Sequence, residues 1–151
     1  PAIRLPSNKG TIDTWNFKHR KNLVVIFHHG KDCQYCRAKL QEIAKAYDKI
    51  KQLEAEVIAI SFDTMQTIQE YASADNIPFP LLSDVNRQVY SKFTCLDSSR
   101  NAPCPSIFIT DRFCELRFQE IAREGYELPD AEEILSWLLF IETECPECSH
   151  L

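Results

Sequence analysis

Short apolar runs alternate with stretches of helical periodicity along most of this chain. An uninterrupted apolar run predicts a buried strand, because a strand covered on both faces needs no polar positions. Apolar residues three and four positions apart predict a helix, as with Leu40, Ile43, Tyr47 and Ile50. We therefore expect strands at 23–28, 57–62, 106–110 and 116–118, and helices at 33–53, 65–75, 86–93 and 131–143, the last capped by Asp130.

This order of elements predicts one α/β domain over residues 1–151. Strands and helices alternate first, and an antiparallel hairpin follows, so the central sheet should be mixed and covered by helices on both faces. Residues 1–22 are a polar lead-in with one edge strand at most, and residues 143–151 are a polar tail. A chain of 151 residues can bury a core without disulfide staples, which leaves its cysteines available for chemistry.

Composition and charge remove several classes of function. The net charge of -5, with no basic run, argues against nucleic-acid and anionic-membrane binding. The longest apolar run, residues 137–141, is far shorter than the ~20 residues that cross a bilayer, so no membrane span is expected. Seven cysteines, an odd number, favour a reducing cytoplasm over export. An exported or anchored form stays open, because the sequence begins at Pro1 and a leader could precede it.

The candidate chemistry centres on Cys33 and Cys36, which follow the first predicted core strand and open a predicted helix. Free amide groups and the positive end of the helix dipole favour a thiolate at the first cysteine, and the second lies within disulfide reach. With Asp32 as the N-cap, Cys33 should attack a substrate disulfide, and Cys36 should resolve the mixed disulfide that forms. His28 and His29 end the strand and point to opposite sides, so at most one approaches Cys33; Asp32 opposes the thiolate by its charge.

Taken in order, four segments of this chain resemble the thioredoxin-fold redoxins, in their peroxiredoxin-like and thiol-reductase branch. They are residues 24–27, 33–40, 77–84 and 105–112, within a match over about residues 20–142. The resemblance implies a thioredoxin-like fold and a thiol-disulfide oxidoreductase that needs no organic cofactor and exchanges electrons with a protein disulfide or dithiol. It also implies that Pro105 is a cis-proline facing the active cysteines, with Cys104 beside it in the substrate groove.

Two other functions stay open. In the first, Cys33, Cys36 and Cys104, with or without a histidine, hold zinc or an iron-sulfur cluster. In the second, the chain is a peroxiredoxin-like peroxidase. We rank peroxidase activity behind disulfide exchange, because residues 31–33 lack the threonine that typical peroxiredoxins carry ahead of the peroxide-reacting cysteine.

The polar tail carries a second Cys-x-x-Cys, formed by Cys145 and Cys148, with His150 close by. This spacing suits a local disulfide or a separate metal site. We do not expect either tail cysteine to resolve Cys33 within one molecule, because the last helix should carry the chain away from the active-site end of the sheet. Cys114 falls in the predicted hairpin turn and is interpreted as structurally incidental.

Overall fold

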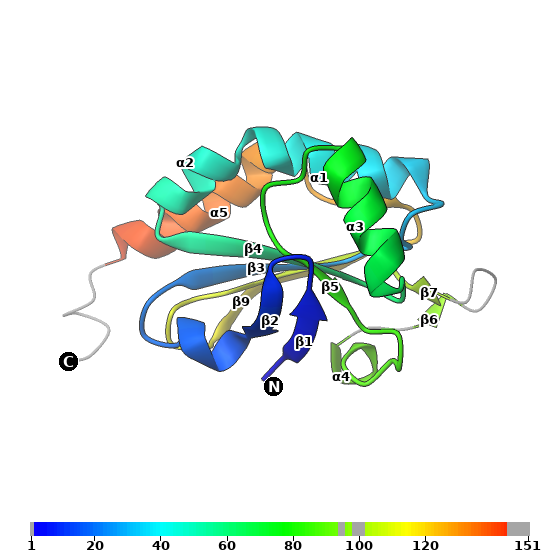
Figure 1. Cartoon of the computed structure of the whole chain (residues 1–151). Coiled ribbons are helices and arrows are strands. Elements are labelled where there is room, and N and C mark those ends of the chain that lie inside the picture. The colour runs from blue at the N-terminus through cyan, green and yellow to red at the C-terminus, as the bar shows by residue number, and fades with distance from the viewer. Residues whose placement is uncertain (1, 94–95, 98–101, 145–151) are drawn as a thin grey trace.

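The computed structural model describes residues 2–93, 96–97 and 102–144, and within them a mixed sheet forms the centre of the molecule (Figure 1). The strand order is β2-β1-β5-β4-β3-β8-β9. Strand β3 is parallel to β4 and antiparallel to β8, so it lies in the middle of the sheet. The strands are β1 (Arg4–Ser7), β2 (Gly10–Asp13), β3 (Asn22–Phe27), β4 (Ala55–Ser61), β5 (Leu81–Ser83), β8 (Ser106–Thr110) and β9 (Leu116–Ile121), and β6 (Leu96–Asp97) and β7 (Ala102–Pro103) form a separate ribbon.

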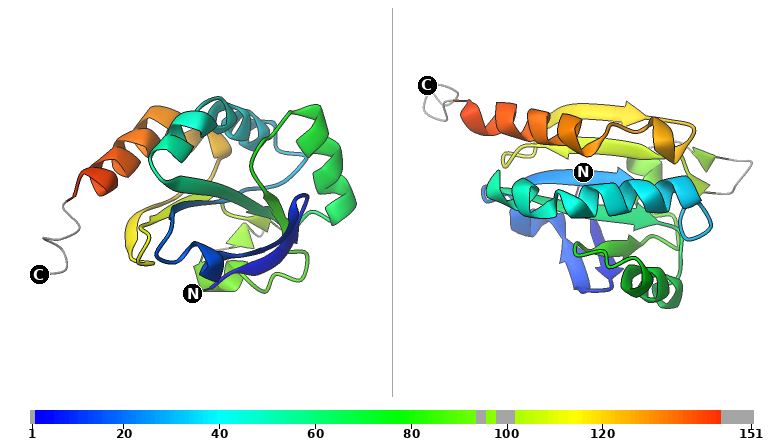
Figure 2. Two further views of the ribbon diagram at one scale, coloured as in Figure 1. Left: turned by 60° about the vertical axis from the view of Figure 1, so that its left-hand side comes forward. Right: turned by 90° about the horizontal axis from the view of Figure 1, so that it is seen from above.

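Helices cover both faces of this sheet unequally. One face carries the longer helices α1 (Gln34–Lys45), α2 (Tyr47–Gln52), α3 (Met65–Ala74) and α5 (Ala131–Thr143) (Figures 1 and 2). The other face carries the single-turn helix α4 (Tyr90–Phe93) and the 3-10 helix η1 (Thr14–Phe17), and a second 3-10 helix, η2 (Gly125–Glu127), precedes α5. The predicted α/β sheet with helices on both faces is confirmed. None of the helices in the described ranges is long and apolar enough to span a membrane.

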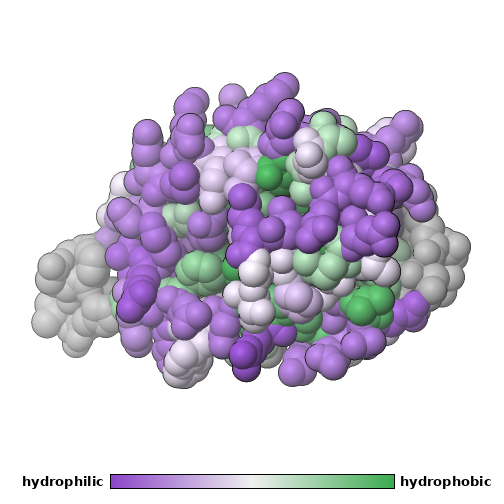
Figure 3. Space-filling model, in the orientation of Figure 1, coloured by the Kyte–Doolittle hydropathy of each residue, from purple (hydrophilic) through white to green (hydrophobic). Residues whose placement is uncertain are grey.

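Two hydrophobic clusters, one on each face, hold the layers together. Alternate residues of β3 point to opposite faces, so Val24 and Ile26 pack under the long helices and Val25 and Phe27 pack against the other side. Both sets are almost fully buried. Polar side chains cover most of the helical side of the surface, with hydrophobic patches below it (Figure 3). Strand β3 is therefore held in place by packing on both faces, and the loop that follows it begins at a fixed position.

Several predicted elements differ from the structure: the helix expected over 86–93 is only the single turn α4, and strands β5, β6 and β7 were not predicted. The expected helix over 33–53 is divided at Ala46, which has φ -96° and ψ 2° and ends α1 before α2 begins. The break brings Tyr47 against Phe79, with ring centroids 5.7 Å apart, while its hydroxyl donates to Glu56 at 2.6 Å. The lead-in contains two paired strands, β1 and β2, where one edge strand at most was expected, and β1 also pairs with β5.

Helix α5 runs away from the start of α1, as predicted. Its first turn is tied to α1, because the Ala131 amide donates to Glu42 at 2.7 Å. Its last turn lies at the other end of the sheet, where Glu142 accepts from Asn22 at 2.7 Å. Cys145, Cys148 and His150 lie outside the described residues, so their expected roles remain predictions.

Candidate active site

The loop between β3 and α1 is held in one conformation by short-range contacts. Gly30 has φ +102°, a conformation that side chains rarely adopt, and a Cβ there would lie 2.7 Å from the Asp63 carboxylate. Asp63 in turn accepts from the Lys31 amide at 3.1 Å. The His28 ring accepts from the Gly30 amide at 3.1 Å through Nδ1. These contacts therefore fix the position at which α1 begins.

Cys33 itself caps helix α1. Its Sγ accepts a hydrogen bond from the Cys36 amide at 3.2 Å, and the helix begins at Gln34. The expectation that Asp32 is the N-cap is therefore wrong: Asp32 is exposed and stands one residue too early. The difference matters for the chemistry, because the sulfur now occupies the position at which a cap oxygen usually accepts from the helix amides.

Cys36 lies in the first turn of α1 and is buried, with 1% of its surface exposed, whereas Cys33 is partly exposed. The Cys36 Sγ accepts a hydrogen bond from the His29 amide at 3.5 Å. Helix η2 packs over this turn, and a Cβ on Gly125 would lie 2.8 Å from the Cys36 amide nitrogen and 3.0 Å from its Sγ. Neither cysteine forms a disulfide. This arrangement agrees with an accessible Cys33 and an inward-facing Cys36.

The two histidines separate as the strand alternation predicts. The ligand atoms of His29, Cys33 and Cys36 all lie within 4.8 Å of one another. His28 instead points into the protein, where burial, assisted by the nearby His29, lowers its pKa to about 3. Its ring is therefore neutral at pH 7, with the proton on Nε2, because Nδ1 is an acceptor. His29 is the histidine placed beside the thiols.

A group of charged and polar residues supports this end of the sheet from α3 and β4. The Arg37 guanidinium makes two hydrogen bonds to Asp75, at 2.8 and 2.7 Å, which join α1 to the end of α3 and raise the pKa of Arg37. Burial raises the pKa of Asp63 and also that of Tyr71. Within the described ranges, His28 Nε2 and the Tyr71 hydroxyl are buried without a hydrogen-bond partner, and their rings are 6.4 Å apart.

Cys104 and Pro105 lie at the same end of the sheet but not as expected. Strand β8 starts opposite the end of β3, with Ser106 paired to Phe27, so these two residues come close to the start of the β3–α1 loop. No described peptide bond is cis, so the expected cis-proline at Pro105 is wrong. Cys104 is disulfide-bonded, and none of the other described cysteines is its partner, so it is unavailable as a third ligand beside Cys33 and Cys36. Its place in a substrate groove remains a prediction.

Three residues at the site were not singled out from sequence: Asp63, Gly125 and Tyr126. Gly125 had a usable signal, because the chain contains only three glycines and two of them, Gly30 and Gly125, pack here. Tyr126 stacks edge-on against Tyr35, with ring centroids 4.9 Å apart, and both rings are exposed. Asp63 follows strand β4, and nothing in its sequence context indicated that it would support Gly30.

Comparison with known proteins gives a family match over residues 1–119, to a model described as the AhpC/TSA family. Peroxiredoxin 2 of Picrophilus torridus is 24% identical over 118 residues, which cover 74% of this chain and 58% of that protein. The putative peroxiredoxin YkuU of Bacillus subtilis is 26% identical over 140 residues, covering 87% and 77%. The chain thus spans somewhat more than half the length of the first of these relatives.

Solved structures agree on the fold. The crystal structure of Enterococcus faecalis AhpC superposes with a TM-score of 0.83 at 20% identity, covering 97% of this chain and 95% of that one. The reduced 2-Cys peroxiredoxin of Plasmodium vivax gives a TM-score of 0.84 at 17% identity, with coverage of 94% and 93%. The predicted thioredoxin-like fold and the resemblance to the peroxiredoxin-like redoxins are both confirmed.

Proposed function

Because this chain belongs to the AhpC/TSA family, we propose that it is a thiol oxidoreductase that cycles between a Cys33–Cys36 dithiol and a disulfide. One observation carries the proposal: a partly exposed sulfur caps a helix, and a second, buried sulfur lies within 4.8 Å of it. Two thiols this close, neither of them in a disulfide, need only a small movement to form an S–S bond. No organic cofactor is needed for such a cycle.

The proposed reaction begins at Cys33. Its thiolate attacks one sulfur of a substrate disulfide, a mixed disulfide forms, and the other substrate sulfur leaves as a thiolate that takes up a proton. Cys36 then loses its proton and attacks Cys33, which releases the second substrate thiol and leaves the Cys33–Cys36 disulfide. The substrate gains two electrons and two protons. The side chain of His29, whose ligand atom lies within 4.8 Å of the Cys36 sulfur, is the group that accepts the Cys36 proton in this scheme.

Reaction with a small disulfide tests this proposal. The reduced protein should release two thiol equivalents per molecule and lose reactivity toward alkylating reagents at both cysteines. Cys36→Ser should stop the reaction at a stable mixed disulfide on Cys33, and Cys33→Ser should abolish it. A mixed disulfide that forms on Cys36 in the Cys33→Ser protein, at the parent rate, would contradict the assigned order.

A hydroperoxide is the second candidate oxidant, and the relatives favour it. The proteins from P. torridus and B. subtilis are named peroxiredoxin and putative peroxiredoxin, which raises the rank of the peroxidase alternative above its place in the sequence analysis. The Cys33 thiolate would attack one peroxide oxygen to give a sulfenic acid and an alcohol or water, and Cys36 would then displace water to form the disulfide. The electrons again come from the two thiols.

The two oxidants are separated by a rate comparison. Reduced protein is mixed with equal concentrations of hydrogen peroxide or of a protein disulfide, and formation of the Cys33–Cys36 disulfide is followed by rapid quenching and mass spectrometry. A peroxide rate at least tenfold higher identifies a peroxidase, and the reverse identifies a disulfide reductase. In both cases we expect a protein dithiol to restore the reduced state.

A further inference from the structure

The loop after β3 and the first turn of α1 bring three metal-binding side chains together. His29, Cys33 and Cys36 are the only such group of three among the described residues, with ligand atoms no more than 4.8 Å apart. Ligands of a tetrahedral zinc ion lie roughly 3.5–4 Å apart, given a Zn–S bond of about 2.3 Å and a Zn–N bond of about 2.0 Å. The three side chains therefore need to close by about 1.3 Å at most to share one ion.

From this geometry we propose that the reduced protein binds one Zn²⁺ through His29, Cys33 and Cys36. The chemistry of the donors supports zinc, since thiolate sulfur and neutral imidazole nitrogen are its usual ligands. The set differs from the one expected from sequence, because the group that the structure brings together contains His29 and not Cys104, which is disulfide-bonded in the structure.

The charge balance selects a divalent ion. Two thiolates and a neutral imidazole exactly offset a charge of +2, whereas a monovalent ion would leave a net negative charge beside the buried Cys36 sulfur. Burial of an uncompensated charge is costly, so the neutral complex is favoured. The neighbouring Asp32 carboxylate is exposed and adds negative potential on the solvent side, which also favours a cation of higher charge.

The surrounding backbone is already arranged for two thiolates. Cys33 Sγ accepts from the Cys36 amide, and Cys36 Sγ accepts from the His29 amide. Such second contacts fix ligand orientation without occupying the metal. Gly125 closes the inner side of the site, while Cys33 is partly exposed, so the fourth position faces solvent. Three protein ligands and one open position are typical of an exchangeable or catalytic zinc ion, not of a closed structural one.

Zinc binding uses the same two cysteines as the proposed redox cycle, but it can be measured in the reduced protein without any turnover. The full chain carrying Cys104→Ser, Cys145→Ser and Cys148→Ser provides the background, because reduction would free the Cys104 thiol and the tail cysteines offer a competing site. This protein is reduced and freed of metal under anaerobic conditions, and Zn²⁺ is then titrated in competition with a chromogenic chelator. We expect one equivalent to bind. Cys33→Ser and Cys36→Ser should abolish binding, and His29→Ala should weaken it at least tenfold.

Two variants at the other end of the molecule serve as matched controls. Cys114→Ser removes an exposed free thiol, and His19→Asn removes an exposed imidazole, so neither should change the zinc affinity more than twofold. Cobalt substitution adds a spectroscopic check, with tetrahedral d–d bands and thiolate charge-transfer bands that shift in His29→Ala.

Unchanged zinc affinity in His29→Ala overturns the assigned ligand set. Absence of a one-equivalent site overturns the assignment to zinc. Loss of redox activity with zinc binding intact contradicts only the proposed function.

Discussion

The two ends of the central sheet each carry a turn with an accessible cysteine, and the turns differ in what surrounds the sulfur. At one end, backbone amides reach Cys33 and Cys36 and the His29 ring lies within 4.8 Å. At the other end, Cys114 lies in the turn between β8 and β9 with φ 68°, exposed and free. In the described part of the chain, Cys114 belongs to no group of metal-binding side chains. Chemistry at a thiol therefore depends on its neighbours and not on exposure alone.

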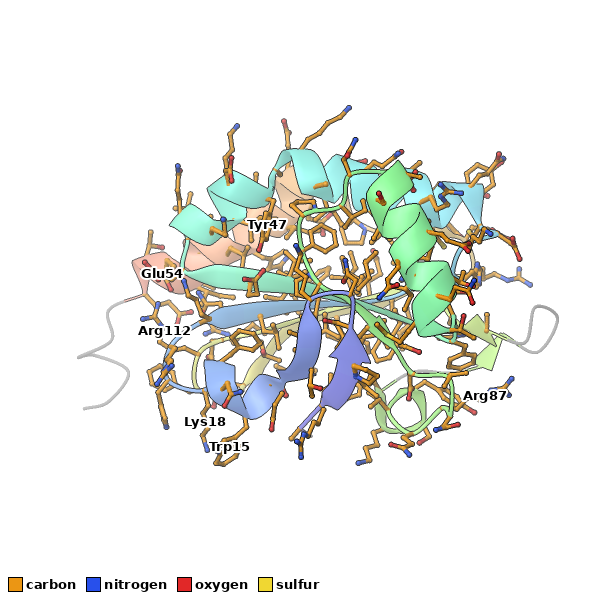
Figure 4. The ribbon with its side chains drawn as sticks, viewed as in Figure 1. Trp15, Lys18, Tyr47, Glu54, Arg87 and Arg112 are labelled. Atoms are coloured by element: carbon orange, nitrogen blue, oxygen red, sulfur yellow. The ribbon has the colours of Figure 1, made fainter. Side chains whose placement is uncertain are left out.

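The end that carries Cys114 is built for stability instead. Asp111 accepts from the amides of Phe113 and Glu115 at 2.9 and 3.0 Å, which closes the hairpin turn. Arg112 pairs with Glu142 of α5, and Lys21 pairs with Glu54 at 3.5 Å; Figure 4 shows Glu54 and Arg112 at this same end of the molecule. These contacts tie the hairpin, the start of β3 and the end of α5 together. None of them needs the Cys114 sulfur.

The largest expected effect comes from removing one thiol at each end. Cys33→Ser should lower the rate of disulfide or hydroperoxide reduction by about 10³-fold or more, because the attacking atom is lost. Cys114→Ser should leave the rate within about twofold, since its sulfur contacts no part of the site. Stopped-flow measurement of substrate consumption decides. A Cys114→Ser protein that loses as much activity as Cys33→Ser would end the distinction between the two turns.

Gly125→Ala should disturb the active end without changing a thiol. The added methyl group meets the Cys36 backbone and sulfur at 2.8–3.0 Å, so α1 or η2 must move. We expect a loss of about 1–3 kcal/mol of stability from overpacking. We also expect about a tenfold slower disulfide formation between Cys33 and Cys36, since 1.4 kcal/mol of misplacement in the transition state has that effect.

Gly10→Ala is the matched control for Gly125→Ala. Gly10, unlike Gly125, has a positive φ of +94°, and a Cβ there meets nothing within 4 Å. Gly10→Ala should lower the free energy of unfolding by about 1 kcal/mol through backbone strain and leave the rate of disulfide formation unchanged. Denaturant unfolding and rapid-quench mass spectrometry give the two readouts. Equal rates in the two variants would show that Gly125 does not position Cys36.

Acid should destabilise the protein through His28. Its pKa is about 3 in the folded protein and 6.5 in its ordinary state, so below pH 6.5 the unfolded chain binds a proton that the folded chain does not. This contribution to stability is complete above pH 6.5 and falls by about 1.4 kcal/mol per pH unit as the pH drops toward 3. His28→Asn keeps an acceptor for the Gly30 amide and should remove this slope.

His19→Asn provides the comparison for His28→Asn, because His19 is exposed and lies near the opposite turn. Its replacement should leave the pH dependence of stability as in the parent protein. Urea unfolding at pH 7, 6 and 5 measures both. A slope that persists in His28→Asn would mean that other groups cause the acid sensitivity.

The sequence was sufficient for the part of the fold that local pattern determines. The apolar run of β3, the helical face of α1 and the capping of α5 by Asp130 follow from periodicity and cap chemistry, and the structure bears them out. The side-chain alternation at the end of β3 also predicted that one histidine alone would approach the thiols. It could not say which one, because the strand ends at Phe27 and the loop sets the direction of His29.

The sequence predictions that the structure contradicts were wrong because tertiary contacts decide those features. Nothing in the helix propensity of residues 44–48 stops the helix at Ala46, and packing of Tyr47 on Phe79 and Glu56 overrides it. The cap was assigned to Asp32 because carboxylates are good caps, but the turn closed by Gly30 brings the Cys33 sulfur to that position. The trans bond at Pro105 and the disulfide of Cys104 depend on contacts that a single sequence does not reveal.

The smallest expected effect concerns the exposed aromatic pair beside the active thiols. Tyr126 follows Gly125, which packs on Cys36; its ring stacks on Tyr35 with centroids 4.9 Å apart, and 60% of its surface is exposed. At the far end, Phe140 is 55% exposed and stacks on Trp137 at 6.2 Å. Tyr126→Leu and Phe140→Leu should each cost about 0.5–1 kcal/mol of stability, the usual worth of such a pair.

Only Tyr126→Leu should slow the reaction with a protein disulfide, by about threefold, if binding of the protein loses a similar energy. A small disulfide, which does not reach the ring pair, should react at the parent rate with both variants. Parallel rate measurements with the two substrates test this, and an equal loss with the small disulfide would assign Tyr126 to the positioning of α1 and not to the partner.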